Sequence, residues 1–235
     1  MSAVDDKISQ LSRQLELLNQ YKKGVMQKIF SQEIRFKNDN GEDFGEWRTC
    51  NILEIADVSI GLVTTMTTNY AEIGVPLIRN SDIKQNKIRT SELIYLTPEF
   101  ANSYENRKLK HKDIVTVHTG DVGVSSVIPQ ELHGSIGFAT INTRVNENEV
   151  NPFYLSWFFN SESFINWCVS VSTGDGRQNL NLKDFNNAVI KLPIMKEQEK
   201  IAEFLTAIDE RIDHTTAQLT HTKQWKKGLL QQMFV

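Results

Sequence analysis

The chain has 235 residues, 40% of them hydrophobic and 23% charged, a composition typical of a water-soluble globular protein. No stretch approaches the roughly 18 consecutive apolar residues of a membrane span, and the acidic N-terminus is unlike a signal peptide, so we expect a cytoplasmic protein. With a net charge of −3, a nucleic-acid-binding surface would have to be a local patch. Cys50, Cys168 and the histidines match no metal-ligand spacing, so the sequence predicts no metal site.

The two ends of the chain carry an internal repeat. Residues 3–30 and 207–234 align without a gap, and 11 of the 28 aligned positions are identical. In both copies apolar residues recur in alternating steps of four and three, which predicts helices with a coiled-coil seam. Lys22 interrupts the seam of the first copy, and Thr215 and Thr222 weaken that of the second. The predicted seam consists of Val4, Ile8, Leu11, Leu15, Leu18, Val25 and Ile29, and of Ile201, Leu205, Ile208, Ile212, Leu219, Leu229 and Met233.

These two helices are expected to cover residues 1–30 and 193–235 and to pair antiparallel within the chain. Glu197 and Glu199 suit the first turn of the second helix, near the positive end of its dipole. The second helix is the longer one. We therefore expect its seam section from Ile201 to Leu205 to have no counterpart and to form an exposed strip for a helix of a partner. The alternative is that this strip packs onto the globular insert.

Between the helices we expect a polar linker, residues 31–46, and a globular insert, residues 47–192. The insert alternates short β-like runs with turns, and the candidate strands are 51–58, 76–78, 93–96, 113–118, 123–128, 135–141 and 188–192. Asn151-Pro152 is typical of a helix start, and we expect an aromatic helix over 153–167 and a short helix after Leu182. The predicted fold class is α+β: one globular domain with a mostly antiparallel β-sheet, flanked by N- and C-terminal long helices that form an antiparallel coiled coil.

Catalytic motifs are weak in this sequence. Residues 151–154, Asn-Pro-Phe-Tyr, resemble the Asn-Pro-Pro-Tyr/Phe signature of adenine methyltransferases, but no glycine-rich cofactor turn accompanies them and a helix start explains them. The chain has no P-loop and no His-Glu-x-x-His pair, so we expect no catalytic residues and no enzyme. A positive cluster is either a local DNA-binding patch or a solvated lysine-rich turn: Arg107, Lys108, Lys110 and Lys112.

Several segments in a fixed order carry a family resemblance. Gly74–Ile83 is similar to a Gly-x-Pro-x-Ile-x-x-x-Asp-Ile pattern, and Leu109–Gly123 to a Leu-x-x-Gly-Asp-Ile…Gly-x-x-Gly pattern, with His111-Lys112 in place of the usual lysine-glycine. Leu192–Ile201 is similar to a Leu-Pro-x-x-x-Glu-Gln-x-x-Ile pattern. With these motifs and the repeated helix ends, the chain resembles the specificity (S) subunit of type I restriction-modification systems, in particular one half of it.

The resemblance implies a non-catalytic subunit of bacterial defence. Its target-recognition domain would read double-stranded DNA and direct methyltransferase (M) and restriction (R) subunits to a bipartite site. The chain itself would hold no cofactor, and S-adenosylmethionine would be bound by the M subunit. Full S subunits have two recognition domains, so this chain is expected to be a half subunit that forms a homodimer, or pairs with another half, through its helices. The alternatives are a coiled-coil interaction scaffold without DNA reading and a stand-alone DNA methyltransferase.

Candidate DNA-reading residues lie on polar or glycine-flanked loops, where ordinary loop polarity is the alternative for each. We expect Arg79→Ala or Arg177→Ala to weaken site recognition by about 1–3 kcal/mol and to leave folding intact. The phosphate-contacting candidates are Lys84, Lys87, Arg107, Lys108 and Lys110. The base-reading candidates are Thr64, Thr65, Thr67, Thr68, Tyr70, Arg79, Asn80, His118, Thr119, Arg177, Gln178 and Asn179.

Overall fold

The computed structural model describes residues 2–174 and 176–233, and the side chains of residues 3–174 and 176–231. The chain divides into two compact units. The helix unit consists of the two chain ends, up to Arg35 and from Lys200, and the globular unit spans Phe36–Glu199. Within the described residues, no helix is long and apolar enough to cross a membrane.

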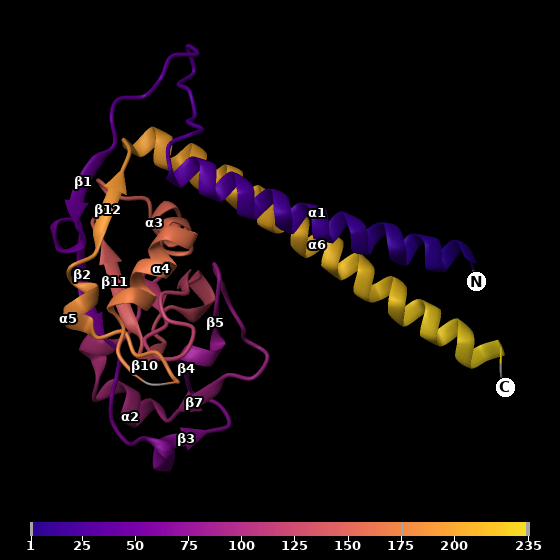
Figure 1. Cartoon of the computed structure of the whole chain (residues 1–235). Coiled ribbons are helices and arrows are strands. Elements are labelled where there is room, and N and C mark those ends of the chain that lie inside the picture. Colours follow the sequence, from indigo (N-terminus) through magenta and orange to yellow (C-terminus); the bar gives the residue numbers. More distant parts are fainter. Residues whose placement is uncertain (1, 175, 234–235) are drawn as a thin grey trace. The chain divides into compact units, whose positions relative to one another are not determined.

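The helix unit is an antiparallel pair of α1 (Ser2–Phe30) and α6 (Met195–Met233), with both chain ends at the same end of the pair (Figure 1). Lys22 Nζ lies 2.5 Å from Asp209 Oδ1, and Lys226 Nζ lies 2.5 Å from Asp5 Oδ1. Both ion pairs fit one register, in which residue i of α1 faces residue 231 − i of α6. The repeat exchanges the two pairs, because it aligns Asp5 with Asp209 and Lys22 with Lys226. The two copies therefore pack on each other around a pseudo-twofold axis.

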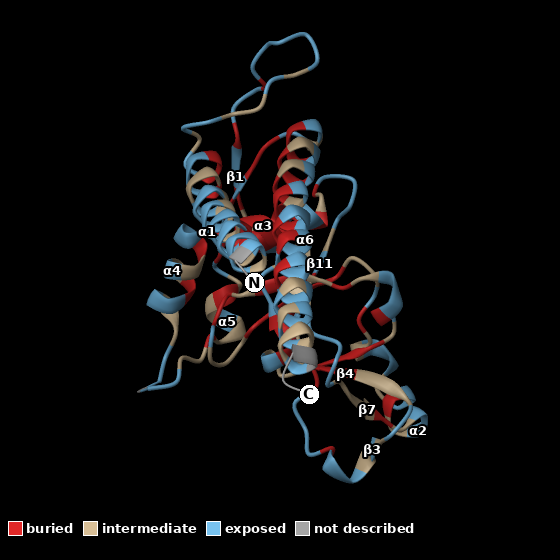
Figure 2. Cartoon of the chain, turned by 90° about the vertical axis from the view of Figure 1, so that its right-hand side faces the viewer, coloured by how far each residue is buried: buried red, intermediate tan, exposed pale blue. Residues whose placement is uncertain are grey.

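The predicted seam is the buried side of this pair. In Figure 2 the buried residues of α6 give way to half-buried and exposed ones toward its C-terminal end. Lys22, which interrupts the seam, has a side chain only 13% exposed and is matched by Asp209 at 10%. Met233 lies outside the described side chains. The buried seam residues are Leu11, Ile29, Ile201, Leu205, Ile208, Ile212 and Leu219, and the half-buried ones are Val4, Ile8, Leu15, Leu18, Val25 and Leu229.

The predicted exposed strip from Ile201 to Leu205 is wrong, because both residues are 0% exposed. In the observed register they face Phe30 and Met26, in the last turns of α1, which are buried as well. The prediction placed the unmatched length of α6 at this end of the seam. The register instead leaves unmatched the turns of α6 before Ile201 and after Leu229.

Short strands of the globular unit form four small sheets, antiparallel throughout except for the neighbours β10 and β4. This is the mostly antiparallel α+β arrangement that the sequence predicts. The two four-stranded sheets, each in spatial order, are β2 (Ala56–Ile60), β11 (Ile141–Val145), β8 (Ile114–Thr116) and β9 (Ser125–Val127), and β10 (Ile136–Phe138), β4 (Val75–Arg79), β7 (Ile94–Leu96) and β3 (Tyr70–Ala71). The two-stranded sheets are β1 (Arg48–Asn51) with β12 (Val189–Leu192), and β5 (Ile83–Lys84) with β6 (Lys87–Ile88).

Two predicted strands are broken in the structure. The run 51–58 is interrupted by a 3-10 turn, η1 (Ile52–Glu54). Asn51 caps this turn by accepting a hydrogen bond from the Leu53 amide, while its own amide donates to Glu54 Oε1 at 2.6 Å. The run 135–141 splits into β10 and the start of β11 because Ala139, with φ +49°, turns the chain between them.

The predicted aromatic helix over 153–167 is two helices, α3 (Pro152–Phe159) and α4 (Glu162–Val171). Asn160 ends α3 by bonding across to β9, where its Oδ1 accepts from the Ser125 amide at 3.1 Å and its Nδ2 donates to the Ser125 carbonyl at 2.8 Å. Ser161 then caps α4 by accepting from the Phe164 amide. The short helices are α2 (Pro98–Asn102) and, after Leu182 as predicted, α5 (Leu182–Phe185).

The first turn of α6 belongs to the globular unit, whose boundary falls after Glu199. Glu197 is 0% exposed and accepts a hydrogen bond from Trp47 Nε1 at 3.0 Å. Gln198 is also 0% exposed; its Oε1 accepts from the Asn151 backbone amide at 2.8 Å, and its Nε2 donates to the Glu149 carbonyl at 2.9 Å. The Glu-Gln pair of the sequence motif therefore fastens the start of this helix to the rest of the globular unit, which is a more specific role for Glu197 than complementing the helix dipole.

Candidate nucleic-acid interface

Three predicted base-reading loops meet in the globular unit. The His118 amide donates to Asn80 Oδ1 at 2.8 Å, the Leu180 amide donates to the His118 carbonyl at 2.9 Å, and the Gly120 amide donates to the Gln178 carbonyl at 3.0 Å. We call this meeting of residues 79–80, 118–120 and 178–180 the loop junction. It lies where β4 and β8 end, so two strands of different sheets hold the loops in place.

A fourth loop, between β2 and β3, is joined to the junction through a backbone turn. The Ala139 carbonyl accepts from Asn80 Nδ2 at 3.3 Å, and the Ala139 amide donates to the Leu62 carbonyl at 3.1 Å. Gly61 and Gly137 permit this close approach, because a Cβ on Gly61 would lie 2.3 Å from the Gly137 carbonyl oxygen. The candidates exposed on this loop and on the first residue of β3 are Thr64, Thr65, Thr67, Thr68 and Tyr70.

The loop that carries Arg177 is a tight turn. Thr173 and Asn179 exchange backbone hydrogen bonds of 3.0 and 2.8 Å across it. Gly174 has φ +115°, and a Cβ there would lie 2.4 Å from the Arg177 carbonyl oxygen, so the turn needs glycine. Arg177 is exposed and has no partner in the described part of the chain, while Gln178 and Asn179 are half-buried.

At the centre of the junction, the side chains of two candidates are hydrogen-bonded to each other. His118 Nδ1 lies 2.8 Å from Thr119 Oγ1, which in turn donates to Asn179 Oδ1 at 3.4 Å. Burial lowers the pKa of His118 below its ordinary value of 6.5. The imidazole is therefore neutral at neutral pH.

Arg79 does not offer a free guanidinium to the junction. Its Nε and Nη2 each lie 2.8 Å from Asp82, whose side chain is fully buried, and Nη2 also donates to the Glu92 carbonyl at 2.9 Å. The hydrogen bond to Asp82, together with that charge, raises the pKa of Arg79. The expectation that Arg79→Ala leaves folding intact does not agree with this geometry, and base reading by Arg79 stays a prediction.

The two Asp-Ile motifs share one structural role that the sequence did not reveal. Asp82 accepts the Arg79 amide at 2.9 Å, and Asp113 accepts the Lys110 amide at 2.7 Å, each three residues upstream. Each carboxylate also holds two nitrogens of an arginine, Arg79 or Arg144, and each is followed by a buried isoleucine. Both motifs therefore brace turns. The recurring spacing of Asp before a buried Ile was the available signal.

Most of the phosphate candidates have partners within the chain. Arg107 Nη1 donates to the Ile60 carbonyl at 2.9 Å, and Lys108 Nζ lies 2.6 Å from Glu105 Oε2. Lys84 and Lys110 are exposed, and Lys84 faces Lys87 across the β5–β6 hairpin. Lys110 lies before the start of β8, whereas the junction residues 118–120 lie after the end of this strand. The positive cluster of the sequence is thus largely engaged in local contacts and lies at the other end of that strand.

Neither cysteine is placed to react as a thiolate. Cys50 and Cys168 are buried free thiols, and burial raises the pKa of Cys168 to about 12. Among the described residues, no group of three or more His, Cys, Asp or Glu side chains is placed to hold a metal ion.

A family model, the type I restriction modification DNA specificity domain, matches residues 45–222. The chain belongs to this family. It is 23% identical, over an alignment 241 positions long, to the type I restriction enzyme MjaVIII specificity subunit of Methanocaldococcus jannaschii, covering 98% of this chain and 56% of that protein. It is 24% identical over 158 residues to the EcoBI specificity subunit of Escherichia coli, covering 64% and 33%.

Solved structures of this family share the fold. The S subunit from M. genitalium matches with a TM-score of 0.62 at 14% identity, over 97% of this chain and 57% of that one. The HsdS subunit from Thermoanaerobacter tengcongensis matches with a TM-score of 0.59 at 18% identity, over 98% and 56%. The chain spans about half the length of these S subunits.

Proposed function

We propose that the chain reads a DNA sequence for a type I restriction-modification complex and performs no catalysis itself. The observation that carries this proposal is the loop junction, which gathers predicted base-reading residues from three distant segments in a member of a DNA specificity family. The strands β4 and β8 hold two of these loops in fixed positions. Sequence readout requires such support, because base edges are distinguished by hydrogen bonds of defined geometry.

Within this proposal the junction and its neighbouring loops divide the work. Arg177, exposed at a tight turn, is suited to a bidentate contact with guanine, and the threonine loop to adaptable polar contacts. Lys84 and Lys110, both exposed, are suited to phosphates, which set position without reading sequence.

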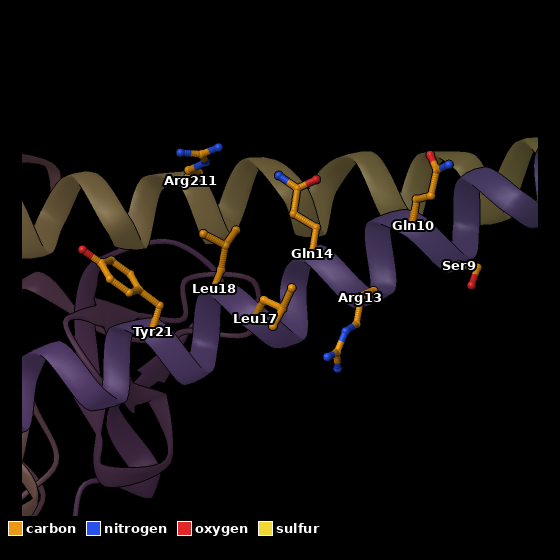
Figure 3. Close-up of a pocket in the computed structure, with 8 residues that line it drawn as sticks. All are labelled: Ser9, Gln10, Arg13, Gln14, Leu17, Leu18, Tyr21 and Arg211. Carbon is orange, nitrogen blue, oxygen red and sulfur yellow. The ribbon is translucent and has the colours of Figure 1, made fainter.

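The proposal includes partners and no cofactor in this chain. The M subunits would bind S-adenosylmethionine and flip the target adenine, and the R subunit would join for cleavage. The helix unit is the proposed docking surface for M subunits. It carries an open groove lined by residues of α1 and by Arg211 of α6 (Figure 3). Two of the lining residues, Leu17 and Tyr21, are 48% and 53% exposed.

This docking surface has a direct test. We expect Leu17→Glu with Tyr21→Glu to abolish co-purification with the M subunit while the chain stays folded, because both side chains are already solvent-exposed. Leu53→Glu is the matched control, since Leu53 is 53% exposed in the globular unit. Loss of M binding in the control, or retention in the double variant, would show that the groove is not the docking surface.

We also propose that two copies form a homodimer that reads a gapped palindrome. The repeat gives α6 the same aspartate and lysine, at the same spacing, as α1. The end of α6 from a second copy can therefore take the place of α1 in the observed register. Light scattering of the chain alone, and with the M subunit, tests this, and a strictly monomeric mass in both samples would exclude it.

DNA reading is tested by gel shift with a duplex library, with and without the M subunit, over a salt series. We expect binding that weakens with salt and a selected bipartite sequence, because phosphate contacts release counterions. Arg177→Ala should lower the preference at one position. A chain that selects no sequence would favour the rival function, a coiled-coil scaffold without DNA reading. Binding of S-adenosylmethionine by the isolated chain would favour a stand-alone methyltransferase.

A further inference from the structure

His118 is a predicted base-reading residue whose side chain and both backbone groups are held within the loop junction. Its amide is bound to Asn80 and its carbonyl accepts from Leu180, so the backbone on which the ring stands is held from two sides. The ring is held as well, because Nδ1 lies 2.8 Å from Thr119 Oγ1. A ring fixed in this way can present its other nitrogen in one direction.

The hydrogen-bond chain decides which nitrogen carries the proton. Asn179 Oδ1 is only an acceptor, so its 3.4 Å contact with Thr119 requires the hydroxyl proton of Thr119. That hydroxyl then has no proton left for His118, and the shorter contact is a hydrogen bond only if His118 Nδ1 donates. Because the partly buried ring is neutral at neutral pH, Nε2 is left unprotonated, with a free lone pair.

This lone pair is open to a ligand. Among the described residues, the enclosed side-chain nitrogens and oxygens without a partner are Asn86 Nδ2, Ser135 Oγ, Thr143 Oγ1 and Asn186 Oδ1. His118 Nε2 makes no hydrogen bond within the described part of the chain. Because it is not among these enclosed atoms, it must be accessible to solvent.

We infer that His118 Nε2 is a hydrogen-bond acceptor that selects the exocyclic amino group of one base, adenine N6 or cytosine N4, on the major-groove edge of the target. These are the amino donors that the major groove presents. The inference rests on the proposed DNA reading and adds the chemistry of one contact to it. Thr119 and Asn179 are positioning residues, because they act through the tautomer of His118.

The tautomer is measured first, without DNA. In the full chain labelled with ¹⁵N-histidine, we expect the His118 resonances of a neutral ring protonated on Nδ1 at neutral pH, and Thr119→Val to shift them toward the Nε2-protonated form. A wild-type ring protonated on Nε2 would overturn the inference while leaving the proposed function untouched.

The contact is measured next, with DNA. Duplex selection at pH 7.5 should give the same sequence for wild type and His118→Ala, except at one base pair where the variant loses its preference. At that pair, an analogue lacking only the amino group should weaken wild-type binding about fivefold and leave His118→Ala unaffected. The analogue lacking only the keto oxygen of the paired base should weaken both proteins equally. Thr119→Val, which keeps the ring, should reduce the amino-group effect at the same pair.

These results separate the two hypotheses. Identical selected sequences for wild type and His118→Ala, or coupling of His118 to the keto oxygen, would refute the acceptor role while sequence reading stands. A wild-type chain that selects no sequence in the presence of the M subunit would refute the proposed function instead. His133→Ala, at an exposed histidine of the globular unit that is not a base-reading candidate, is the control for histidine loss, and it should bind and select as wild type does.

Discussion

Arg79 offers the sharpest test of how the recognition domain is built. In Arg79→Ala, the Asp82 carboxylate stays 0% exposed but loses both guanidinium hydrogen bonds. It keeps the backbone amide of residue 79 at 2.9 Å, and Arg89 remains 3.8 Å away. Removing one partner of a buried ion pair typically costs about 3–5 kcal/mol. Because the Arg79 side chain is 27% exposed and Arg89 partly compensates, we expect about 2–3 kcal/mol of lost unfolding free energy.

The assay is thermal and urea denaturation of the chain. For a domain of this size, each kcal/mol lowers Tm by about 2–4 °C, so we expect Tm to fall by roughly 4–12 °C. Arg177→Ala is the matched control, because Arg177 is exposed and its loss should change stability by less than about 0.5 kcal/mol. Arg79→Lys, which keeps the charge and loses the planar fork, should lie between them. An Arg79→Ala variant with wild-type Tm and altered base preference would refute the bracing role.

Three further predictions test other parts of the structure. Lys22→Ala and Asp209→Ala should each lower the unfolding free energy of the helix unit by about 1–3 kcal/mol, measured by urea denaturation. The charge swap Lys22→Asp with Asp209→Lys should recover part of that loss. If nothing is recovered, the ion pair does not set the register. Cys168 should resist thiol reagents at pH 8.5 until the chain unfolds. Because its pKa is raised from 9.0 to about 12 in the folded chain, Cys168 should lower stability as pH rises above about 9, by up to roughly 1.4 kcal/mol per pH unit. Cys168→Ala should remove that contribution and leave the part due to Cys50 and Tyr154, whose pKa values are raised as well. Rapid modification of Cys168 in the folded protein would contradict its burial. Gly137→Ala should lower Tm strongly, because the new Cβ would lie 2.1 Å from Thr140 Oγ1, whereas Gly45→Ala, with open space, should not; equal melting of the two variants would contradict the tight corner.

The helices and the fold class were predictable because their signals are local. A seam with steps of four and three specifies a helix and its buried side, so Leu11 and Ile212 could be placed from the sequence alone. The register was not predictable from the seam, since apolar residues pair in several alignments. It became clear only from two ion pairs that join residues far apart in the sequence, Lys22 with Asp209 and Asp5 with Lys226.

The errors in the globular unit have two physical causes. Asn160 ends a helix because Ser125, 35 residues away, offers its backbone amide and carbonyl, and no local pattern contains that partner. Arg79 looked like a free reading group although its partner Asp82 is only three residues away, because the sequence does not show that this carboxylate is buried. Loop polarity identified the segments that meet at the junction. It could not distinguish the side chains that hold the loops from those that remain open, such as Arg177.

The anchored first turn of α6 has a consequence for grafting recognition domains between proteins of this kind. A joint at Leu192, where the last strand ends, would separate Trp47 from Glu197, and would leave the Glu149 carbonyl and the Asn151 amide without Gln198. A joint one turn into the helix, after Glu199, would carry these hydrogen bonds with the transplanted domain and would interrupt regular helix backbone hydrogen bonds, which another helical sequence can re-form. The transplantable piece of this chain therefore ends inside a helix and not at the loop before it.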